Sequence, residues 1–477
     1  LKVAVEGRRA RQSVLGTSLH VRDGAIGRRV HRSVEVPYES VACADSRIAA
    51  CAKRRVRPFD VSSAPLMRLV SIRTPRRHAL LFDFHHAVCD QAGLRIVLDD
   101  FAALYHEDAL PPLAVDYKDC AVWLEGRLAS DASERHAAYW RERLSGNLPV
   151  LSLPTERPRT NERKGAACEA RIAASARAAM RALVRSRKAT VATALMTVFG
   201  LVLSRTALQD EVVIGMPVEN RMQPAMQHTA GAFINTVPVR CAFSDGQTVR
   251  ACFDAVHRAL SEALSHQDYP FERIVADVGA ARQRGRNPLF DAMLVFGKDQ
   301  VSLTLEGVSA TPRFVDVATA KLDVTLFVYE AADGLTCRLE YDRNLFSAAA
   351  ARRMLDRFTH TAATLFEAPD EGIARASVLP VEEYQLVTSG FAGDEMPVRN
   401  RPLCAWVEDL ADRRPCDEAV VAVDGRLTFS ELDRQADCLA RALAVAGAGP
   451  GAQGDQLPLP YANAHIKDSF PFIPIPS

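Results

Sequence analysis

The sequence predicts a mixed α/β protein built of two or three packed units. The chain has 477 residues, which is more than one hydrophobic core of ordinary size accommodates. Hydrophobic residues make up 48% of it and charged residues 25%, the proportions of a globular protein. Short strand-like runs alternate with amphipathic helical runs along most of its length.

Composition also argues against several functions. The net charge of +1 gives the molecule no overall field that would attract nucleic acid or an anionic membrane. Arginine-rich segments such as CAKRRVR, residues 51–57, are interpreted as solvated faces. No apolar run approaches the ~18 residues that a membrane span needs. We therefore expect neither nucleic acid nor a membrane among the partners.

The cysteines point to a reducing compartment. There are 11 of them, scattered singly, without a C-x-x-C pair or a Cys/His cluster at zinc spacing. An odd number in a long chain favours reduced thiols over a disulfide framework. No signal peptide is recognisable at the N-terminus, which lacks an initiator Met. These features predict a cytoplasmic protein without a structural metal site.

Residues 1–146 predict a first lobe in which strands precede helices. Strand-like runs occupy residues 33–41, 65–73 and 79–87, and the last is apolar enough to be buried. A helix is expected over 94–107, and a second helix over 132–146 ends at a glycine. One face of the first helix carries only apolar side chains: Leu94, Val97, Leu98, Phe101 and Leu104.

A segment rich in proline and charge, residues 147–165, predicts a linker to a second lobe. The second lobe, residues 166–385, again alternates helices with strands. Its elements are expected in this order: an apolar helix over 190–208, strands over 211–218 and 231–243, an amphipathic helix over 250–267, a hairpin over 323–342 that turns at Asp333-Gly334, and a helix over 350–368.

The composition changes again beyond the second lobe. Residues 386–402 are rich in acids, proline and glycine and predict another linker. A further unit is expected over 403–451. Residues 452–477 show little strand or helix periodicity and are expected to be poorly ordered.

The stretch LLFDFHHAVCDQAG, residues 80–93, contains the candidate site. Its apolar run ends in two adjacent histidines, His85 and His86, and Asp90 follows four residues later. If the strand continues through both histidines, their rings point to opposite faces, so that one lines a cleft while the other packs inward. The pattern alone is compatible with catalysis, metal binding or a structural role, although a structural zinc needs about four ligands.

Acyl transfer is the chemistry that suits this trio best. A neutral imidazole accepts a proton from an attacking amine or hydroxyl, or holds that nucleophile in place. Asp90 would fix the loop through an ion pair with an arginine. The helix that begins after Asp90 would point its N-terminus toward the same place and favour negative charge on the carbonyl oxygen of a thioester.

The same stretch resembles a family signature. HHAVCDQAG is similar to the HH-x-x-x-D-G motif of condensation domains of nonribosomal peptide synthetases, which belong to the chloramphenicol-acetyltransferase-like superfamily. Four further segments resemble motifs of that family in the same order: YKDCAVW at 117–123, GAFINTVPVR at 231–240, HQDYPFE at 266–272 and RQRGRNPLF at 282–290. The resemblance extends over about residues 1–385.

The resemblance implies two chloramphenicol-acetyltransferase-like lobes, each a mixed β-sheet with flanking helices, arranged as a V with the active site at their junction. It implies a donor and an acceptor that are each bound as a thioester to the phosphopantetheine arm of a carrier protein. The chain itself would bind no cofactor and no metal. His86 is expected to be the catalytic or positioning base, while His85 and Asp90 shape the loop around it.

A second set of residues is expected to support the cleft: Arg11, Gln91, Gly93, Asn235, Thr236 and Arg240. Asn235 and Thr236 lie where the resemblance implies a strand that crosses toward the other lobe. HQDYPFE is interpreted as a segment for packing and lobe closure rather than for catalysis. Asn287 and Pro288 are expected to form a turn before a buried strand.

The beginning of the chain departs from the family pattern. No segment resembles the family's opening S-x-A-Q-x-R-[LM]-[WY], so the first strand and helix are expected to be missing. The family segment R-H-E-x-L-R-T-x-F corresponds to RQSVLGTSL, residues 11–19, in which Gln12 replaces the histidine and Gly16 the second arginine. The resemblance implies that an arginine from this segment pairs with Asp90, which leaves Arg11 as the substitute, because an unpaired buried carboxylate is costly.

A third departure lies inside the signature. Gln91 stands where the family has the glycine after the aspartate. If that position needs a positive φ, Gln91 is strained.

The unit at 403–451 carries its own resemblance. LTFSEL, residues 427–432, is similar to the first core motif of adenylation domains, and the similarity stops near Gly451. A truncated adenylation domain is therefore expected as a neighbour of the condensation domain. Two alternatives to peptide-bond formation stay open: an ester-forming or epimerising relative, and a catalytically degenerate domain that only docks carriers.

Overall fold

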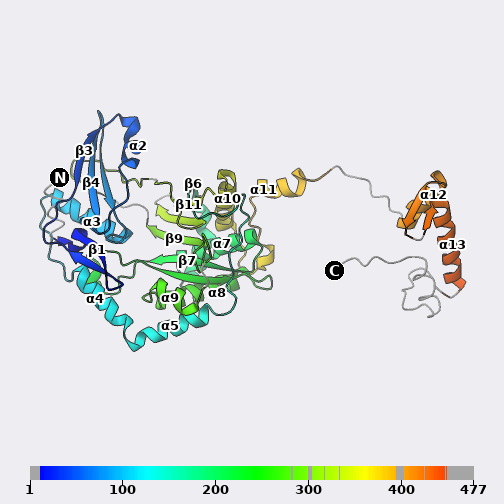
Figure 1. The fold of residues 1–477 in the computed structure, drawn as a ribbon, viewed down its shortest axis with the longest axis horizontal. Coiled ribbons are helices and arrows are strands. Elements are labelled where there is room, and N and C mark those ends of the chain that lie inside the picture. Colours follow the sequence, from blue (N-terminus) through cyan, green and yellow to red (C-terminus); the bar gives the residue numbers. More distant parts are fainter. Residues whose placement is uncertain are drawn as a thin grey trace. The chain divides into compact units, whose positions relative to one another are not determined.

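The computed structural model describes residues 11–280, 283–298, 303, 305–315, 317–331, 334–393, 402–423, 425–445 and 447. The chain divides into two compact units, Leu1–Gly390 and Phe391–Ser477. Helices and strands occur in both units (Figure 1), which confirms the mixed α/β class. The segment expected to be poorly ordered, 452–477, lies outside the described residues, as does Asp333 of the expected hairpin turn.

The N-terminal lobe of the first unit contains two small sheets. β3 (Tyr38–Ala42) pairs in parallel with β4 (Met67–Arg73), and β4 pairs antiparallel with β5 (His78–Phe84). β1 (Thr17–Arg22) and β2 (Ala25–Val30) form a separate antiparallel hairpin. The three strands of the first sheet lie where hydrophobic patterning predicted them, although β5 ends earlier than expected.

Four helices accompany these strands: α2 (Ile48–Lys53), α3 (Gln91–Tyr105), α4 (Tyr117–Leu128) and α5 (Asp131–Arg143). The apolar face predicted for α3 is confirmed, because Val97, Leu98 and Phe101 are buried. The helix begins directly after Asp90, whose side chain caps it, and this places the candidate site at the junction between β5 and α3.

The C-terminal lobe is built on a six-stranded sheet with the order β6-β11-β10-β9-β7-β8. Its pairs are antiparallel except that β9 runs parallel to both β10 and β7. The expected hairpin is formed by the two strands β10 and β11. The strands are β6 (Gly165–Ala173), β7 (Glu211–Val218), β8 (Asn235–Ala242), β9 (Ala292–Lys298), β10 (Val324–Ala331) and β11 (Gly334–Asp342).

Helix α7 is the buried centre of this lobe. Its sequence is apolar all round, and nearly its whole length is buried. It packs against α8 and α10, which in turn pack against β8 and β6. The α-helices are α6 (Ala178–Ser186), α7 (Val191–Ala207), α8 (Val249–Ser265), α9 (Phe271–Val278), α10 (Ala348–Thr364) and α11 (Val381–Gln385). Short turns of other helix types cover Ser13–Gly16, Asp45–Arg47, Ser175–Arg177, Pro224–Met226, Ile373–Arg375 and Leu386–Gly390.

In the described part of the chain, no single helix has the length and apolarity to span a membrane. Helices α6 and α7 meet both criteria only as a pair that is bent by 117°.

The passage between the lobes is packed against the second lobe. Trp140 and Leu144, at the end of α5, lie in the same buried apolar cluster as the C-terminal sheet and helices. The proline-rich segment expected as a linker contributes Leu151 and Leu153 to that cluster before β6 begins. Helix α5 therefore belongs by its packing to the second lobe.

The second unit is a small α/β element. It consists of α12 (Leu403–Arg413), the antiparallel strands β12 (Glu418–Ala422) and β13 (Gly425–Thr428), and α13 (Phe429–Val445). Glu431 accepts a hydrogen bond from the N–H of Thr428 (2.9 Å), which helps to fix the start of α13. The unit occupies the range in which the sequence predicted a further unit.

Candidate active site

The histidine pair lies in a tight turn between β5 and α3. β5 ends at Phe84, and the N–H of His85 donates to the carbonyl of Leu66 (2.9 Å). The N–H of Val88 then donates to the carbonyl of His85 (3.0 Å), and the N–H of Ala87 donates to its Nδ1 (3.2 Å). These bonds fold the backbone into a turn. The expectation that both histidines lie on one strand with opposite faces is therefore wrong.

The turn leaves His86 exposed and His85 half-buried. Both line a cavity of about 530 Å³. The other lining residues come from α2, the loop after it, the end of β5 and a segment of the C-terminal lobe: Lys53, Val56, Arg57, Pro58, Phe59, Asp83, Phe84 and Val317. The cavity thus takes residues from both lobes.

Asp90 is the buried anchor of this turn. It is 3% exposed, and its Oδ1 accepts a hydrogen bond from the N–H of Gly93 (2.6 Å). Arg221 donates from its two terminal nitrogens to the two carboxylate oxygens, at 3.1 and 3.0 Å. The N–H groups of Phe233 and Ile234 donate to Oδ2 at 3.0 and 3.2 Å. A buried carboxylate needs such partners, and three of these residues come from the C-terminal lobe.

Asp90 also occupies the N-terminus of α3 as its cap. We expected this helix end to face the carbonyl oxygen of a thioester, but its charge preference for an anion is already met by the aspartate. The same carboxylate therefore positions the histidine turn and closes the helix.

The arginine that pairs with Asp90 is not the one that the resemblance implied. Arg11 instead donates to Asp100 on α3 (3.2 Å). Gly16 lies buried in a short helical turn. The partner of Asp90 is Arg221, 131 residues away in the sequence, so the site does not contain the unpaired carboxylate that the loss of the second arginine indicated.

Gln12 takes over a bridging role at the position of the missing histidine. It is buried, and its Nε2 donates to Asp100 and to the carbonyl of His228, both at 3.0 Å. Its Oε1 accepts a hydrogen bond from the N–H of Ala230 (2.9 Å). The segment at 11–19 thus joins the two lobes through a neutral amide.

The strain expected at Gln91 is not observed. Gln91 is the first residue of α3 and does not have a positive φ. The close approach occurs at Gly93 instead, where a Cβ would lie 3.1 Å from both Oδ1 of Asp90 and the carbonyl oxygen of Gly231. Gly93 therefore lets the helix start tightly against the carboxylate.

A second set of contacts holds the histidine turn from the side of the β1–β2 hairpin. Arg28 donates to the carbonyl of Ala87 (2.8 Å) and to the hydroxyl of Tyr117 (3.3 Å). Its guanidinium lies 4.5 Å from the centre of the Tyr117 ring. The Tyr117 hydroxyl donates to the carbonyl of Ala232 (3.0 Å). The first residue of YKDCAVW therefore links the hairpin to GAFINTVPVR.

Two titratable side chains beside the histidines are affected by burial. Burial, together with the charge of Asp90, raises the pKa of Cys89 to about 12, so this thiol stays protonated at neutral pH and does not serve as a nucleophile. Burial also raises the pKa of Asp83, an effect opposed by Arg68, whose Nε lies 3.3 Å away. His86 is the exposed imidazole of this group.

Asn235, at the start of β8, forms side-chain hydrogen bonds to the backbone of the HQDYPFE segment. Its Nδ2 donates to the carbonyls of Gln267 and Tyr269, each at 2.7 Å, and its Oδ1 accepts from the N–H of Phe271 (3.1 Å). It follows directly after Ile234, which contacts Asp90. Asn235 therefore supports the site from the strand behind it.

Thr236 and Arg240 lie further along β8. Thr236 is half-buried and pairs with Pro217 of β7. Arg240 forms an ion pair with Glu211 (2.6 Å). Arg240 lies five positions after Asn235 along the strand, which corresponds to about 16 Å. At that distance Arg240 does not contact the histidine turn, and its ion pair stabilises the sheet instead.

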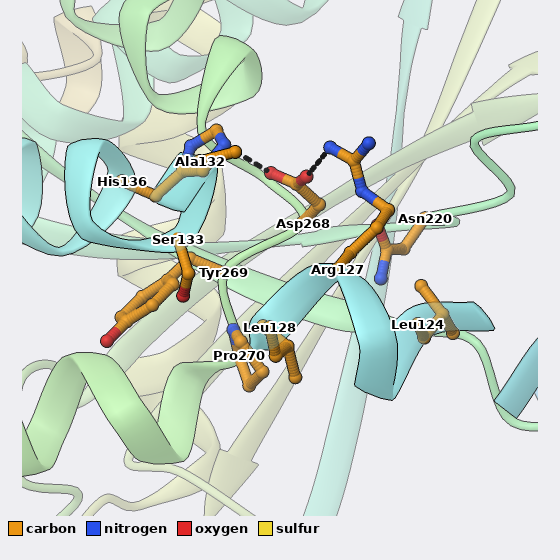
Figure 2. A pocket seen from close by; sticks show the side chains of 10 residues that line it. All are labelled: Leu124, Arg127, Leu128, Ala132, Ser133, His136, Asn220, Asp268, Tyr269 and Pro270. Carbon is orange, nitrogen blue, oxygen red and sulfur yellow. Dashed lines mark hydrogen bonds and ion pairs between the residues drawn. The ribbon is translucent and has the colours of Figure 1, made fainter. Parts of the chain in front are cut away.

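HQDYPFE lines a second cavity, of about 170 Å³ (Figure 2). Asp268 lies between Arg127 of α4 (2.6 Å) and His136 of α5 (3.4 Å). The Nδ1 atoms of His136 and His266 are 2.8 Å apart, and the ring of Tyr139 stacks on His266 at 3.9 Å. These contacts join α4 and α5 to the C-terminal lobe, as the packing interpretation of the motif requires.

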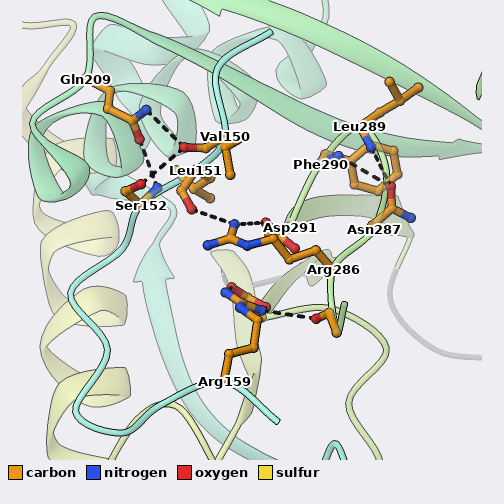
Figure 3. Close-up of polar contacts among 12 residues, drawn as sticks. Val150, Leu151, Ser152, Arg159, Gln209, Arg286, Asn287, Leu289, Phe290 and Asp291 are labelled. Atoms are coloured by element: carbon orange, nitrogen blue, oxygen red, sulfur yellow. Dashed lines mark hydrogen bonds and ion pairs between the residues drawn. The ribbon is translucent and has the colours of Figure 1, made fainter. Parts of the chain in front are cut away.

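The described part of RQRGRNPLF builds a turn (Figure 3). Oδ1 of Asn287 accepts hydrogen bonds from the N–H groups of Leu289 (3.1 Å) and Phe290 (3.3 Å), both of which are buried before β9. Arg286 donates to the carbonyl of Leu151 in the segment between the lobes (3.0 Å). The predicted turn is confirmed.

Two polar residues of the site were missed from the sequence. Arg221 follows β7, and an arginine at the end of a buried strand was the available signal for a partner at the lobe junction. Arg28 gave no signal, because the β1–β2 hairpin was not predicted. Among the described residues, no group of three or more His, Cys, Asp and Glu side chains is placed to hold a metal ion.

Comparison with known proteins gives a consistent result. The family model described as the condensation domain matches residues 16–388. The chain is 32% identical over 405 residues to a plipastatin synthase component of Bacillus subtilis (strain 168), in an alignment that covers 83% of this chain and 11% of that protein. It is 29% identical over 457 residues to tyrocidine synthase 3 of Brevibacillus parabrevis, with 94% of this chain and 7% of that protein covered. The chain thus spans only a small part of these curated relatives.

Solved structures share the fold at low sequence identity. The X-domain in its complex with OxyB from teicoplanin biosynthesis superposes with a TM-score of 0.73 at 21% identity, covering 80% of this chain and 87% of that one. The first condensation domain of the calcium-dependent antibiotic synthetase, in complex with a substrate analogue, gives a TM-score of 0.67 at 18% identity, covering 80% and 90%. These matches confirm the fold class.

Proposed function

Because the chain belongs to the condensation-domain family, we propose that it joins a donor thioester and an acceptor amine into an amide in nonribosomal peptide synthesis. The observation that carries the proposal is the exposed imidazole of His86, which lines the cavity of about 530 Å³ on a turn anchored by the buried Asp90. An exposed base on a fixed turn is suited to proton transfer at a bound substrate.

The reaction needs one proton acceptor. The acceptor's amine nitrogen attacks the donor's thioester carbonyl carbon, and a C–N bond forms while the C–S bond breaks. The imidazole of His86 takes the proton that the nitrogen loses and returns it to the departing thiolate. His85 holds the turn through its Nδ1, and Asp90 fixes the turn to both lobes. The protonated Cys89 thiol offers no covalent acyl route.

The partners follow from the substrates. We propose that donor and acceptor arrive as thioesters on the phosphopantetheine arms of two carrier proteins or domains. The unit at 403–451 is proposed to be the start of an adenylation domain, on the strength of LTFSEL at 427–432 and of the strand–helix element that contains it. Gly93 and Asn235 would keep the backbone of the site in place, the first by its close approach to Asp90 and the second by its hydrogen bonds to the HQDYPFE segment. Gln91 would support the site as the first residue of α3, and Thr236 through its pairing with Pro217 in the sheet.

The test is amide formation by the purified chain offered two loaded carrier proteins. Intact-protein mass spectrometry follows the appearance of the dipeptidyl carrier. His86→Ala should lower the rate by about 10²–10⁴-fold without changing the urea midpoint, because the ring is exposed. The matched control is His78→Ala, which removes an exposed histidine at the other end of β5 and should keep the rate of the unaltered chain.

Other outcomes identify the alternatives. An ester product would identify an ester-forming relative. An epimerised donor without bond formation would identify an epimerising relative. Carrier binding without turnover, equal in the unaltered chain and in His86→Ala, identifies a docking domain. The X-domain that was solved in complex with OxyB has the same fold, so this last outcome is tested directly by measuring binding and turnover on the same samples.

A further inference from the structure

Two cysteines of the N-terminal lobe, Cys43 and Cys51, have their thiols in hydrogen-bonding contact. Cys43 follows β3 and is half-buried, so that small solutes reach it. Cys51 lies on α2 and is 3% exposed, within an apolar cluster against which Cys43 packs. The sequence contains no C-x-x-C motif, and it is the fold that brings these two sulfurs together.

The backbone on both sides of the pair is already fixed. The N–H of Cys43 donates to the carbonyl of Arg73 at the end of β4 (3.0 Å). Between the two cysteines, the short turn Asp45–Arg47 runs directly into α2, and Asp45 accepts a hydrogen bond from the hydroxyl of Thr74 (2.7 Å). A disulfide needs sulfurs about 2.05 Å apart in a specific side-chain geometry. Because the thiols already share a hydrogen bond, side-chain rotation can bring the sulfurs together while these anchors stay in place.

The two thiols differ in their surroundings. Partial burial, then the hydrogen bond with Cys51, raise the pKa of Cys43; Asp45 adds to this effect and Arg55 opposes it. Cys43 therefore stays protonated at neutral pH and reacts slowly until oxidant accumulates. Arg55 donates to the Sγ and to the carbonyl of Cys51, both at 3.1 Å, and to Glu39 (3.2 Å). The guanidinium is thus held against the Cys51 sulfur, where it stabilises negative charge on that sulfur during an attack.

We propose that Cys43 and Cys51 form a site of reversible oxidation by small disulfides such as glutathione disulfide. First, the Cys43 sulfur attacks glutathione disulfide, and a mixed disulfide forms while one glutathione leaves with the proton of Cys43. The Cys51 sulfur then attacks the Cys43 sulfur, and the second glutathione leaves with the proton of Cys51. The two cysteines together lose two electrons and two protons, which glutathione disulfide gains as it becomes two thiols.

The bond would connect the end of β3 to the helix that precedes one wall of the histidine cavity. The loop after α2 contributes four residues to that wall: Val56, Arg57, Pro58 and Phe59. Val56 also packs against the cluster that contains Cys51. A bond at Cys51 therefore restricts the motion of α2 and of the loop that follows it. This chemistry needs no substrate of the condensation reaction, so it does not depend on the proposed function.

The test maps the bond in the unaltered chain. The reduced protein is equilibrated with mixtures of glutathione and glutathione disulfide, blocked with N-ethylmaleimide and digested with trypsin without reductant. Cleavage after Arg47 and Lys53 separates the two cysteines, so the bond joins peptides 33–47 and 48–53 and lowers their summed mass by two hydrogen atoms. The folded chain should form this cross-link at a glutathione disulfide concentration about tenfold or more below that needed in concentrated urea, because the fold raises the effective concentration of one thiol at the other. Dithiothreitol should reverse it.

Variants test the order of the two steps. Cys43→Ser should leave Cys51 unmodified, because the buried thiol is reached through Cys43. Cys51→Ala should leave Cys43 as the mixed disulfide with glutathione. Arg55→Met should slow the conversion of the mixed disulfide to the cross-link by about tenfold. Arg54→Met is its matched control, because it removes an exposed charge at the neighbouring position, and Cys168→Ser removes another half-buried thiol, on β6; neither should change the reaction.

Hydrogen exchange measures the effect on the cavity wall. Amides of residues 48–59 should exchange about tenfold more slowly in the oxidised chain than in the reduced chain, while residues 348–364 of α10 should be unchanged.

Three results would overturn the proposal. In the first, both thiols of the folded chain stay free, or carry glutathione, without a cross-link at any ratio. In the second, the cross-link forms no more readily in the folded chain than in urea, so that the fold does not create the site. In the third, oxidation leaves the exchange of residues 48–59 unchanged, which would separate the bond from the cavity wall. A cross-link formed by a chain that makes no amide would leave this site standing while the condensation activity fails.

Discussion

Arg221 and Asp90 form a two-point ion pair across the lobe junction, with both side chains 2% exposed. The pair joins the end of the β7 segment to the start of α3, directly behind the histidine turn. Both charged groups are desolvated, so removing one would leave the other as an uncompensated buried charge. The guanidinium also lies 4.6 Å from the centre of the Phe233 ring, which closes this side of the pair.

Removing the arginine should be strongly destabilising. In Arg221→Met, the carboxylate of Asp90 keeps its backbone donors but loses its counter-charge in a buried site. We expect a loss of about 3–5 kcal/mol in the free energy of unfolding, measured by urea denaturation of the first unit's transition, and a loss of amide formation because the histidine turn is released.

Arg240→Met is the matched control for that change. Its ion pair with Glu211 is partly exposed, so the loss should stay below about 1 kcal/mol. Replacing both members of the buried pair, in Asp90→Leu with Arg221→Met, should recover part of the stability but not the activity. Equal effects of Arg221→Met and Arg240→Met would show that the buried pair is not the anchor.

Gly231→Ala should disrupt the site from the side of the second lobe. A Cβ at this position would lie 1.9 Å from Cδ2 of Tyr117 and 2.1 Å from its Cε2. The ring cannot easily retreat, because its hydroxyl is bonded to Ala232 and Arg28 lies over its face. We expect a destabilisation of about 2 kcal/mol, seen as a lower urea midpoint.

Gly126→Ala gives the opposite sign as a control. Gly126 lies inside α4 with nothing within 4 Å of the new Cβ. Alanine should therefore stabilise the helix by up to about 1 kcal/mol. If Gly231→Ala also stabilises the protein, the close approach of Tyr117 to the second lobe is wrong.

Arg28→Ala should affect the rate more than the stability. Arg28 is exposed, yet its bond to the carbonyl of Ala87 lies next to His86. We expect kcat to fall by about tenfold, while the free energy of unfolding changes by less than about 0.5 kcal/mol. Arg28→Lys should restore part of kcat, because an ammonium can still donate to the carbonyl but does not form the same stack.

Arg29→Ala removes the neighbouring charge on β2 without a known contact to the turn, and it should leave kcat unchanged. A fall in kcat that is the same for Arg28→Ala and Arg29→Ala would assign the effect to hairpin charge rather than to the bond with Ala87.

The contact between His266 and His136 should make stability depend on pH. Burial, and then the charge of His136, lower the pKa of His266 below its ordinary value of 6.5. The unfolded chain then binds more protons than the folded one, so His266's contribution is fully present above about pH 6.5 and is lost as the pH falls below it. Urea denaturation at pH 7.5 and pH 5.5 should show the loss.

His266→Gln should flatten that part of the pH profile, because the titrating ring is gone. His78→Gln, which removes an exposed histidine, should keep the profile of the unaltered chain. If His266→Gln and the unaltered chain lose the same stability between the two pH values, the histidine contact does not titrate as inferred.

The elements of the fold could be predicted because their signals are local. The apolar period of α3 and the apolar run of β5 are visible in any short window of the sequence. The exact end of β5 was not, because it depends on hydrogen bonds of the His85 backbone and ring with Leu66 and Ala87. An apolar run continues through the point at which the backbone turns.

The partners of the elements were harder to predict. The pattern of α5 shows that one face is buried but not by which lobe, and Trp140 packs into the second one. The pairing of Asp90 with Arg221 spans 131 residues. The sequence motif indicates that the aspartate lies beside the histidine turn, but only the folded chain determines which of its many arginines reaches it.

The carboxylate of Asp90 has one further consequence, for motion. It is attached covalently to the first lobe and by four hydrogen bonds, from Arg221, Phe233 and Ile234, to the second. If the lobes swing apart, rotation about this point costs less than rupture of all four bonds. The pivot then lies beside the imidazole of His86, and the cavity widens mainly at its outer end. In such a motion the imidazole of His86 moves less than the outer end of the cavity.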